Sequence, residues 1–181
     1  GFDACVSAQQ VFGGHGYIQE WGMEQLVRDV RIAQIYEGTN GIQALDFAVR
    51  KVAADGGAAL NGLLTEIENA LQQTPQPQLS ALLVQYRQLV TSLLTAAAQD
   101  ANLLPTVACD LLDLTGYLLY GYMWQQTLTA LDPAKHSADF IASKQQTATF
   151  YFERILPKAT GLVALLQQPT GVVSHFAETL F

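Results

Sequence analysis

Apolar residues recur at the three- and four-residue spacing of an α-helix along most of the chain, and no segment alternates convincingly at the two-residue period of a strand. The first helical pattern covers residues 2–12 and ends at Gly13-Gly14-His15-Gly16, where three glycines in four residues disfavour a regular helix and permit positive φ. Helical spacing resumes over 24–36. After the next glycine, Thr39 or Asn40 can cap another helix.

A change in pattern after these short helices predicts a domain boundary. The run Ala53-Ala54-Asp55-Gly56-Gly57 interrupts the helical spacing, and a proline-bracketed loop over 74–78 separates two of the helices that follow. The whole chain is therefore predicted to be all-α, a helical bundle with domains at 1–54 and 55–181. The helices predicted for the second domain cover residues 60–71, 82–97, 103–131, about 138–155, and a short tail to about 166.

The segment 103–131 is apolar nearly all round and allows two interpretations. Residues 114–131 carry no charge over 18 residues, at the lower edge of the roughly 17–25 residues of a transmembrane helix. Polar residues interrupt this stretch and two aspartates lie just upstream, so we predict no membrane span but the central helix of a bundle. Gly116 and Gly121 are expected to let neighbouring helices approach closely.

Composition narrows the classes of protein that fit. Charged residues make up only 14% of the chain, against about 25% in typical soluble domains, so a partner subunit or a further part of the same protein is expected to cover much of the surface. The net charge of −7 and the lack of a basic stripe argue against nucleic acid binding. Cys5 and Cys109 match no metal or redox spacing, and are predicted to be buried free thiols of a cytoplasmic protein.

The first residues contain no signal peptide and look like the middle of a helix. We therefore expect the sequence to begin inside a larger protein.

Two features could carry chemistry, and each also has a plainer interpretation. The loop over 10–17 could hold a phosphate on consecutive backbone N–H groups, but a glycine turn of this kind is more often a connection between helices. Glu37 could be a solvated acid at the start of a helix. Gly38, however, would let a ligand approach this carboxylate without a Cβ in the way.

Other polar and aromatic groups are interpreted as structural. Arg28, Asp29 and Arg31 could hold an anionic ligand, but an ion-paired surface is favoured. His15, His136 and His175 lack the pairing of a catalytic triad or metal site and are predicted to be structural or exposed. For Asp110 and Asp113 a buried polar network or an interface is favoured. Core packing is favoured for the aromatic run Tyr117, Tyr120, Tyr122 and Trp124.

Taken together, several short motifs in residues 1–52 resemble the C-terminal catalytic helices of acyl-CoA dehydrogenases. Each motif is weak alone, but their order and spacing are highly specific. They are QVFGGHGY at 10–17, Glu20, Glu24, Arg28-Asp29, Arg31, IYEGTN at 35–40, and Ile42-Gln43. Residues 55–181 resemble, less specifically, the extra helical domain of some bacterial members. The resemblance thus predicts truncated catalytic helices over 1–54 and an appended bundle over 55–181.

The resemblance implies an FAD-dependent oxidation of a fatty acyl-CoA to the trans-2-enoyl-CoA. It assigns removal of the α-proton to Glu37 and contact with the substrate thioester to Gly38. Because the α-proton of a thioester is weakly acidic, the base must be held against it in a dry site. The enolate oxygen needs donors already in place, and the resemblance assigns one of them to the backbone N–H of Glu37.

The same resemblance implies cofactor and protein partners, with no metal. The predicted FAD-binding run over 10–14 reaches the FAD of a neighbouring subunit, so a homo-oligomer is expected. The resemblance also implies an electron-accepting flavoprotein as partner. The second run ends at Gly41, where several members have a side chain, so only its backbone can contribute here. The predicted FAD-binding residues are Gln10, Val11, Phe12, Gly13, Gly14, Thr39, Asn40 and Gly41.

Two alternatives remain open at the level of sequence. An acyl-CoA oxidase would share the same base and pass electrons to oxygen. A non-catalytic helical module would use residues 55–181 for oligomerisation and the motif helices as scaffold. Because most of a flavin pocket would lie outside this sequence, the isolated chain is expected to retain no FAD and to catalyse nothing.

Overall fold

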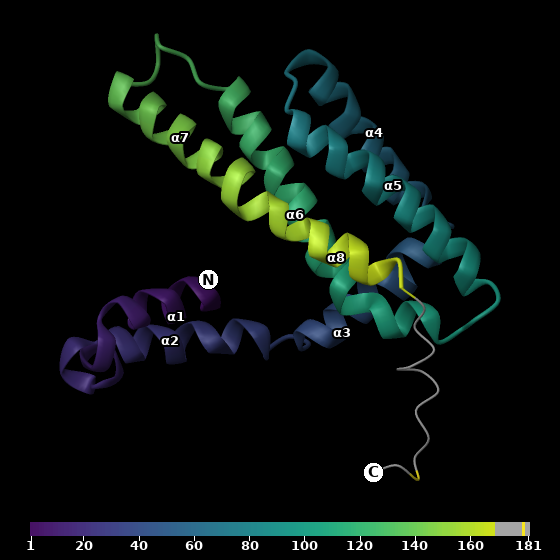
Figure 1. Cartoon of the computed structure of the whole chain (residues 1–181), viewed down its shortest axis with the longest axis horizontal. Helices are drawn as coiled ribbons and strands as arrows, with labels where there is room; N and C mark the ends of the chain where they lie inside the picture. Colours follow the sequence, from purple (N-terminus) through teal and green to yellow (C-terminus); the bar gives the residue numbers. More distant parts are fainter. Residues whose placement is uncertain (169–178, 180–181) are drawn as a thin grey trace. The chain divides into compact units, whose positions relative to one another are not determined.

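A computed structural model describes residues 1–168 and 179 of the chain, and its regular elements are all helices (Figure 1). The predicted all-α fold is confirmed for this described part. The chain divides into two compact units, Gly1–Gln43 and Ala44–Phe181. The division falls within the short helix α3 (Asn40–Leu45). The domain boundary predicted between residues 54 and 55 stays a prediction.

The first unit consists of two short helices that pack against each other, joined by a glycine-rich connection. The first helix ends where predicted, at the glycine turn. The second helix ends earlier than the predicted residue 36, because its last residues tighten into a 3-10 turn. Buried residues in the unit are Gly16 and Met23. The elements are α1 (Phe2–Val11), η1 (Gly13–Tyr17), η2 (Gln19–Trp21), α2 (Met23–Arg31) and η3 (Ile32–Gln34).

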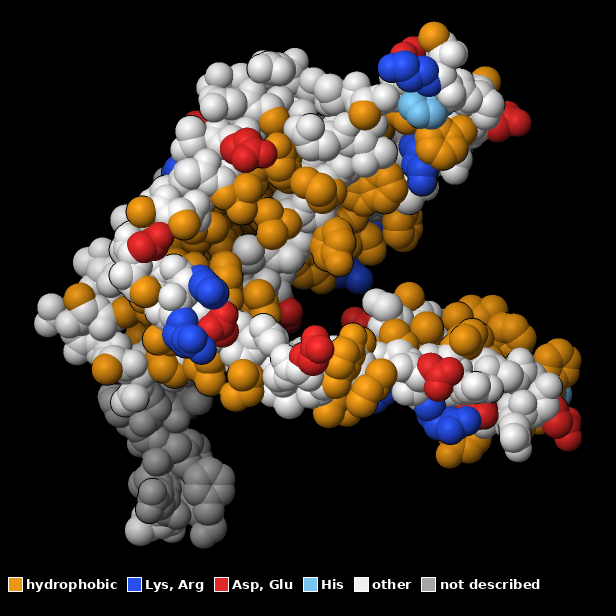
Figure 2. All heavy atoms as spheres, turned by 180° about the vertical axis from the view of Figure 1, so that it is seen from behind, with side chains coloured by type: hydrophobic (Ala, Val, Ile, Leu, Met, Phe, Trp, Pro, Cys, Tyr) orange, Lys and Arg blue, Asp and Glu red, His pale blue; other side chains and the backbone are white. Residues whose placement is uncertain are grey.

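The first unit therefore exposes many apolar side chains, as Figure 2 shows along its surface. Val11 is 86% exposed and Tyr17 is 81% exposed. Leu26 and Tyr36, which lie in the helical pattern predicted over 24–36, are 53% and 55% exposed. The apolar spacing thus marks a face that nothing within this unit covers.

The second unit contains the hydrophobic core. The helix predicted over 60–71 is confirmed, and its residues Leu60, Leu64, Ile67 and Leu71 are all buried. Its next helix begins at Pro77 rather than after the predicted loop, because proline lacks the N–H that an N-terminal position leaves unpaired. The elements are η4 (Asp46–Ala53), α4 (Ala58–Gln73), α5 (Pro77–Ala97), α6 (Leu103–Thr129), α7 (Ala138–Phe150), η5 (Tyr151–Ile155), η6 (Leu156–Lys158) and α8 (Ala159–Leu166).

Helix α6 is the central helix of this bundle. It contacts η4, α4, α5, α7 and α8, which explains why the predicted stretch is apolar nearly all round. Within the described residues it is also the one helix long and apolar enough to cross a membrane by length and composition. Leu111, Leu114 and Leu118 on α6 are each at most 1% exposed, so we interpret α6 as a core helix.

The two glycines of α6 differ in their surroundings. A Cβ at Gly121 would lie 2.8 Å from Cδ1 of Leu79, so the predicted close approach is confirmed there. A Cβ at Gly116 would meet nothing within 4 Å, so the same prediction is wrong for Gly116. Only one of the two glycines faces the neighbouring helix α5.

Buried polar groups of the second unit are paired across helices. The Thr115 hydroxyl donates to the Leu111 carbonyl at 2.6 Å, so the proton of its 2.7 Å bond with Tyr86 must come from the tyrosine. Burial raises the pKa of Tyr86 to about 12. Gln125, 1% exposed, donates to the carbonyls of Ala70 and Thr74 and so caps the C-terminal end of α4.

Other predictions for the chain need correction or stay open. Cys109 is exposed and Cys5 is half-buried, so neither is the buried thiol expected, and the predicted compartment stays a prediction. Tyr120 is 67% exposed whereas Tyr122 is buried, so the aromatic run only partly packs in the core. His175 lies outside the described residues.

Candidate active site

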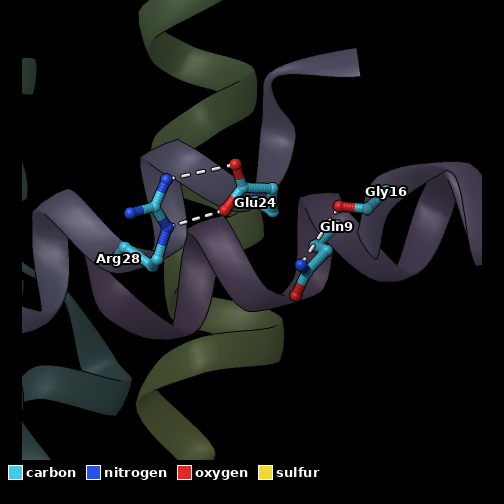
Figure 3. Close-up of polar contacts among 4 residues, drawn as sticks. All are labelled: Gln9, Gly16, Glu24 and Arg28. Carbon is cyan, nitrogen blue, oxygen red and sulfur yellow. Dashed lines mark hydrogen bonds and ion pairs between the residues drawn. The ribbon is translucent and has the colours of Figure 1, made fainter. Parts of the chain in front are cut away.

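The glycine-rich turn is held against α1 by a side chain of that helix. Gln9 donates from Nε2 to the carbonyl oxygen of Gly16 at 3.1 Å (Figure 3). Gly16 is buried, and a Cβ there would collide with the Gln9 carbonyl oxygen and approach Cβ of Phe12 to 2.9 Å. Position 16 therefore requires glycine for close packing, while Gly13 takes a positive φ of 59°.

Aromatic contacts fix the far side of the same turn. The ring of Trp21 lies edge-on to His15, with centroids 5.1 Å apart, and edge-on to Phe12 at 6.3 Å. His15 therefore has a packing role, as predicted. The five residues from Gln10 to Gly14 all remain exposed, so nothing within the first unit covers this part of the turn.

The charged face of α2 is ion-paired, in agreement with the favoured interpretation for Arg28. Its Nε and Nη2 donate to the two carboxylate oxygens of Glu24 at 2.7 and 3.2 Å (Figure 3). The hydrogen bond from Arg28 lowers the pKa of Glu24. Arg31 donates to Gln34 at 2.9 Å and lies 5.8 Å above the ring of Phe2. Both guanidinium groups therefore make their contacts within the first unit.

Glu37 has an unusual backbone conformation. Its φ of 53° makes it the one non-glycine residue with positive φ in the described chain. For an L-residue this left-handed conformation costs roughly 1–2 kcal/mol. Such strain persists only where neighbouring contacts hold it, and it is concentrated at functional sites.

The contacts that hold this turn come from the start of α3. The side chain of Gln43 reaches back six residues, and its Nε2 donates to the Glu37 carbonyl oxygen at 2.8 Å. Thr39 caps the helix as predicted, since its Oγ1 accepts from the N–H of Ile42 at 3.4 Å. Gly38 follows with a φ of 94°, and a Cβ there would lie 2.9 Å from Nε2 of Gln43. In the sequence, Gln43 is recognisable only as part of a motif.

The Glu37 side chain is exposed and is not enclosed by the helices of its own unit. Gly38, Thr39 and Asn40 beside it are exposed as well, and Gly41 is half-buried. A carboxylate in this position is open to a ligand. Among the described residues, no group of three His, Cys, Asp or Glu side chains could hold a metal ion.

The structure does not bring the two predicted cofactor runs together within the first unit. Residues 10–14 adjoin the start of α2, whereas residues 37–41 follow its end (Figure 1). Helix α2 alone has nine residues, a rise of about 13 Å. The two runs therefore lie at opposite ends of that helix.

Comparison with known proteins identifies the family of this chain. A family model described as "Acyl-CoA dehydrogenase, C-terminal domain" matches residues 1–51, and one described as "Acetyl-CoA dehydrogenase C-terminal like" matches residues 48–175. The chain belongs to the acyl-CoA dehydrogenase family. The two matches meet at residues 48–51, just after the Glu37 turn and α3.

This chain matches only part of the length of each relative. A 3-methylmercaptopropionyl-CoA dehydrogenase of Ruegeria pomeroyi is 37% identical over 162 residues, which cover 81% of this chain and 27% of the relative. A broad-specificity linear acyl-CoA dehydrogenase of Mycobacterium tuberculosis is 29% identical, covering 95% and 31%. An acyl-CoA dehydrogenase of Bacillus subtilis is 50% identical over 42 residues, covering 23% and 11%. The chain thus spans less than a third of these relatives.

Proposed function

We propose that this chain forms the C-terminal part of an FAD-dependent acyl-CoA dehydrogenase that converts an acyl-CoA to its trans-2-enoyl-CoA. The observation that carries the proposal is the exposed carboxylate of Glu37, held in a left-handed turn beside Gly38 and in front of α3. The names of the relatives, which are dehydrogenases of acyl-CoA thioesters, support this reaction over oxygen-dependent oxidation.

Glu37 acts in this proposal as the base that removes the α-proton. A thioester α-proton is weakly acidic, so the carboxylate oxygen must be held in contact with it, and the developing enolate oxygen must be stabilised as it forms. The backbone N–H of Glu37 serves as one donor to that oxygen. Gly38 leaves room for the thioester, since it carries no side chain.

The residues present fit the FAD contacts that the resemblance implies. Cβ atoms built at Gly13, Gly14 and Gly41 would meet nothing within 4 Å, and Thr39 and Asn40 are exposed. Bound FAD would supply the acceptor for the hydride that leaves the β-carbon. Residues 10–14 and 37–41 lie at opposite ends of α2, which supports contacts to two different FAD molecules and hence a homo-oligomer.

The second unit is proposed to be the appended helical domain of this enzyme. The match over residues 48–175 supports this assignment. An electron-accepting flavoprotein is the proposed redox partner. Length and branching of the acyl chain would be set by the parts of the enzyme that complete the pocket.

A Glu37→Gln change in the full-length, FAD-loaded enzyme tests this proposal. The amide keeps the shape of the side chain but cannot accept the α-proton. The rate of flavin reduction by acyl-CoA in a single turnover should fall about 10²–10⁴-fold, the usual contribution of a general base. FAD content and acyl-CoA affinity should stay close to those of the unmodified enzyme.

The matched control is Asp3→Asn, which neutralises an exposed carboxylate on α1 of the same unit. It should leave the rate of flavin reduction unchanged. Wild-type flavin reduction in the Glu37→Gln enzyme would show that Glu37 is not the base and would favour a scaffold role for these helices.

A further inference from the structure

We infer that Gln43 is a positioning residue for the Glu37 base: its side-chain amide holds the turn in which Glu37 projects its carboxylate. This inference rests on the proposed function of Glu37. Gln43 has no assigned role in the sequence motif. The contact that assigns one is the 2.8 Å hydrogen bond from its Nε2 to the Glu37 carbonyl oxygen.

The hydrogen bond fixes the peptide group on the C-terminal side of Glu37. With the carbonyl of Glu37 held by the first turn of α3, rotation about the Glu37 backbone is restricted. The φ of 53° at Glu37 is a conformation that an L-residue leaves readily when nothing retains it. Because the Cα–Cβ bond and the N–H of Glu37 share this backbone, the amide of Gln43 sets the direction of both.

Gly38 is part of the same arrangement. Its φ of 94° already favours glycine, and a Cβ there would lie 2.9 Å from Nε2 and 3.7 Å from Cδ of Gln43. A side chain at position 38 would therefore displace the Gln43 amide from the Glu37 carbonyl. Gly38 thus serves the Gln43 contact as well as leaving room for a thioester.

Two variants of the full-length, FAD-loaded enzyme separate hydrogen bonding from shape. Gln43→Ala removes the side chain, and Gln43→Glu keeps its shape but, when ionised, replaces the donor with an acceptor that repels the Glu37 carbonyl oxygen. Both should slow flavin reduction at saturating acyl-CoA by about 10–100-fold, as expected for a misplaced catalytic group. The dissociation constant for acyl-CoA should change less than threefold, on the order of experimental scatter.

An isotope effect distinguishes positioning from general damage. Because proton removal would become slower relative to other steps, the effect of α-deuterated acyl-CoA on flavin reduction should increase in both variants. Gln25→Ala, an exposed glutamine on α2 of the same unit, is the matched control and should leave rate and isotope effect unchanged. If Gln43→Ala loses FAD or unfolds, the rate of flavin reduction and the isotope effect of the isosteric Gln43→Glu enzyme test the positioning role.

The outcomes separate this inference from the proposed function. A slow Glu37→Gln enzyme together with wild-type rates in both Gln43 variants would overturn the positioning role and leave the base assignment intact. A Gln43→Glu enzyme as fast as wild type would show that the amide donor is not needed. A wild-type rate in Glu37→Gln would overturn both.

Discussion

At the scale of single residues, burial and strain distinguish groups that look alike in the sequence. Glu37 was identifiable from its motif and from Gly38 beside it, but its own positive φ was not, because most non-glycine residues avoid that region. The partner that holds it, Gln43, lies six residues away and carries no local signal of its contact. Such side chain-to-backbone bonds depend on the turn already being formed.

Tyr86 provides a residue-scale prediction about stability. Its pKa is raised from 10 to about 12 by burial, so the folded chain retains the neutral hydroxyl when the unfolded chain has lost its proton. This contribution is complete below pH 10 and is lost as pH rises through about 12, at about 1.4 kcal/mol per unit between these values. The resulting loss in the free energy of unfolding is measured by urea unfolding of the 181-residue chain at pH 9 and pH 11.

The Tyr86→Phe chain should lose less stability over the same interval, because it has no hydroxyl to ionise at this position. At pH 9 it should be less stable by about 1 kcal/mol, since the hydrogen bond to Thr115 is gone. Equal losses in the two chains between pH 9 and pH 11 would contradict the assignment.

At the scale of elements, apolar spacing predicted α4 and α5 well because each of these helices buries one stripe. On α5, Leu79, Leu82 and Leu89 are all buried. The same reasoning was weaker for α6, because a helix covered on several sides gives no periodicity that marks a face. Gly116, Gly121 and Tyr120 could therefore not be assigned to their neighbours from the sequence.

The two glycines of α6 provide a matched pair of substitutions. Gly116→Ala should raise the free energy of unfolding by about 0.5–1 kcal/mol, because alanine favours the helix and its Cβ meets nothing within 4 Å. Gly121→Ala should lower it by about 1–3 kcal/mol, because its Cβ presses on Leu79, whose side chain is fully buried. Urea unfolding of both chains checks this; a shift of the same sign in both would refute the packing described for Gly121.

At the scale of the whole molecule, the first unit contains the predicted catalytic residues but little core of its own. Val11, Tyr17 and Trp21 are each more than half exposed, and buried positions in the unit are Gly16 and Met23. The low charged fraction of the sequence predicted that further protein covers such a surface. The chain spans 27% and 31% of the relatives from Ruegeria pomeroyi and Mycobacterium tuberculosis, so the activity must be tested in the full-length enzyme.

Proton exchange at the α-carbon is the most direct test of whether Glu37 is the base. The full-length enzyme is incubated in D₂O with an acyl-CoA that has an α-hydrogen but no β-hydrogen, such as phenylacetyl-CoA, so that base action is measured without hydride transfer. Mass spectrometry follows deuterium entering the α-position. Enzyme-dependent exchange is expected, and the Glu37→Gln change should reduce it at least about 100-fold. A variant that exchanges deuterium as fast as the wild-type enzyme would show that Glu37 is not the base.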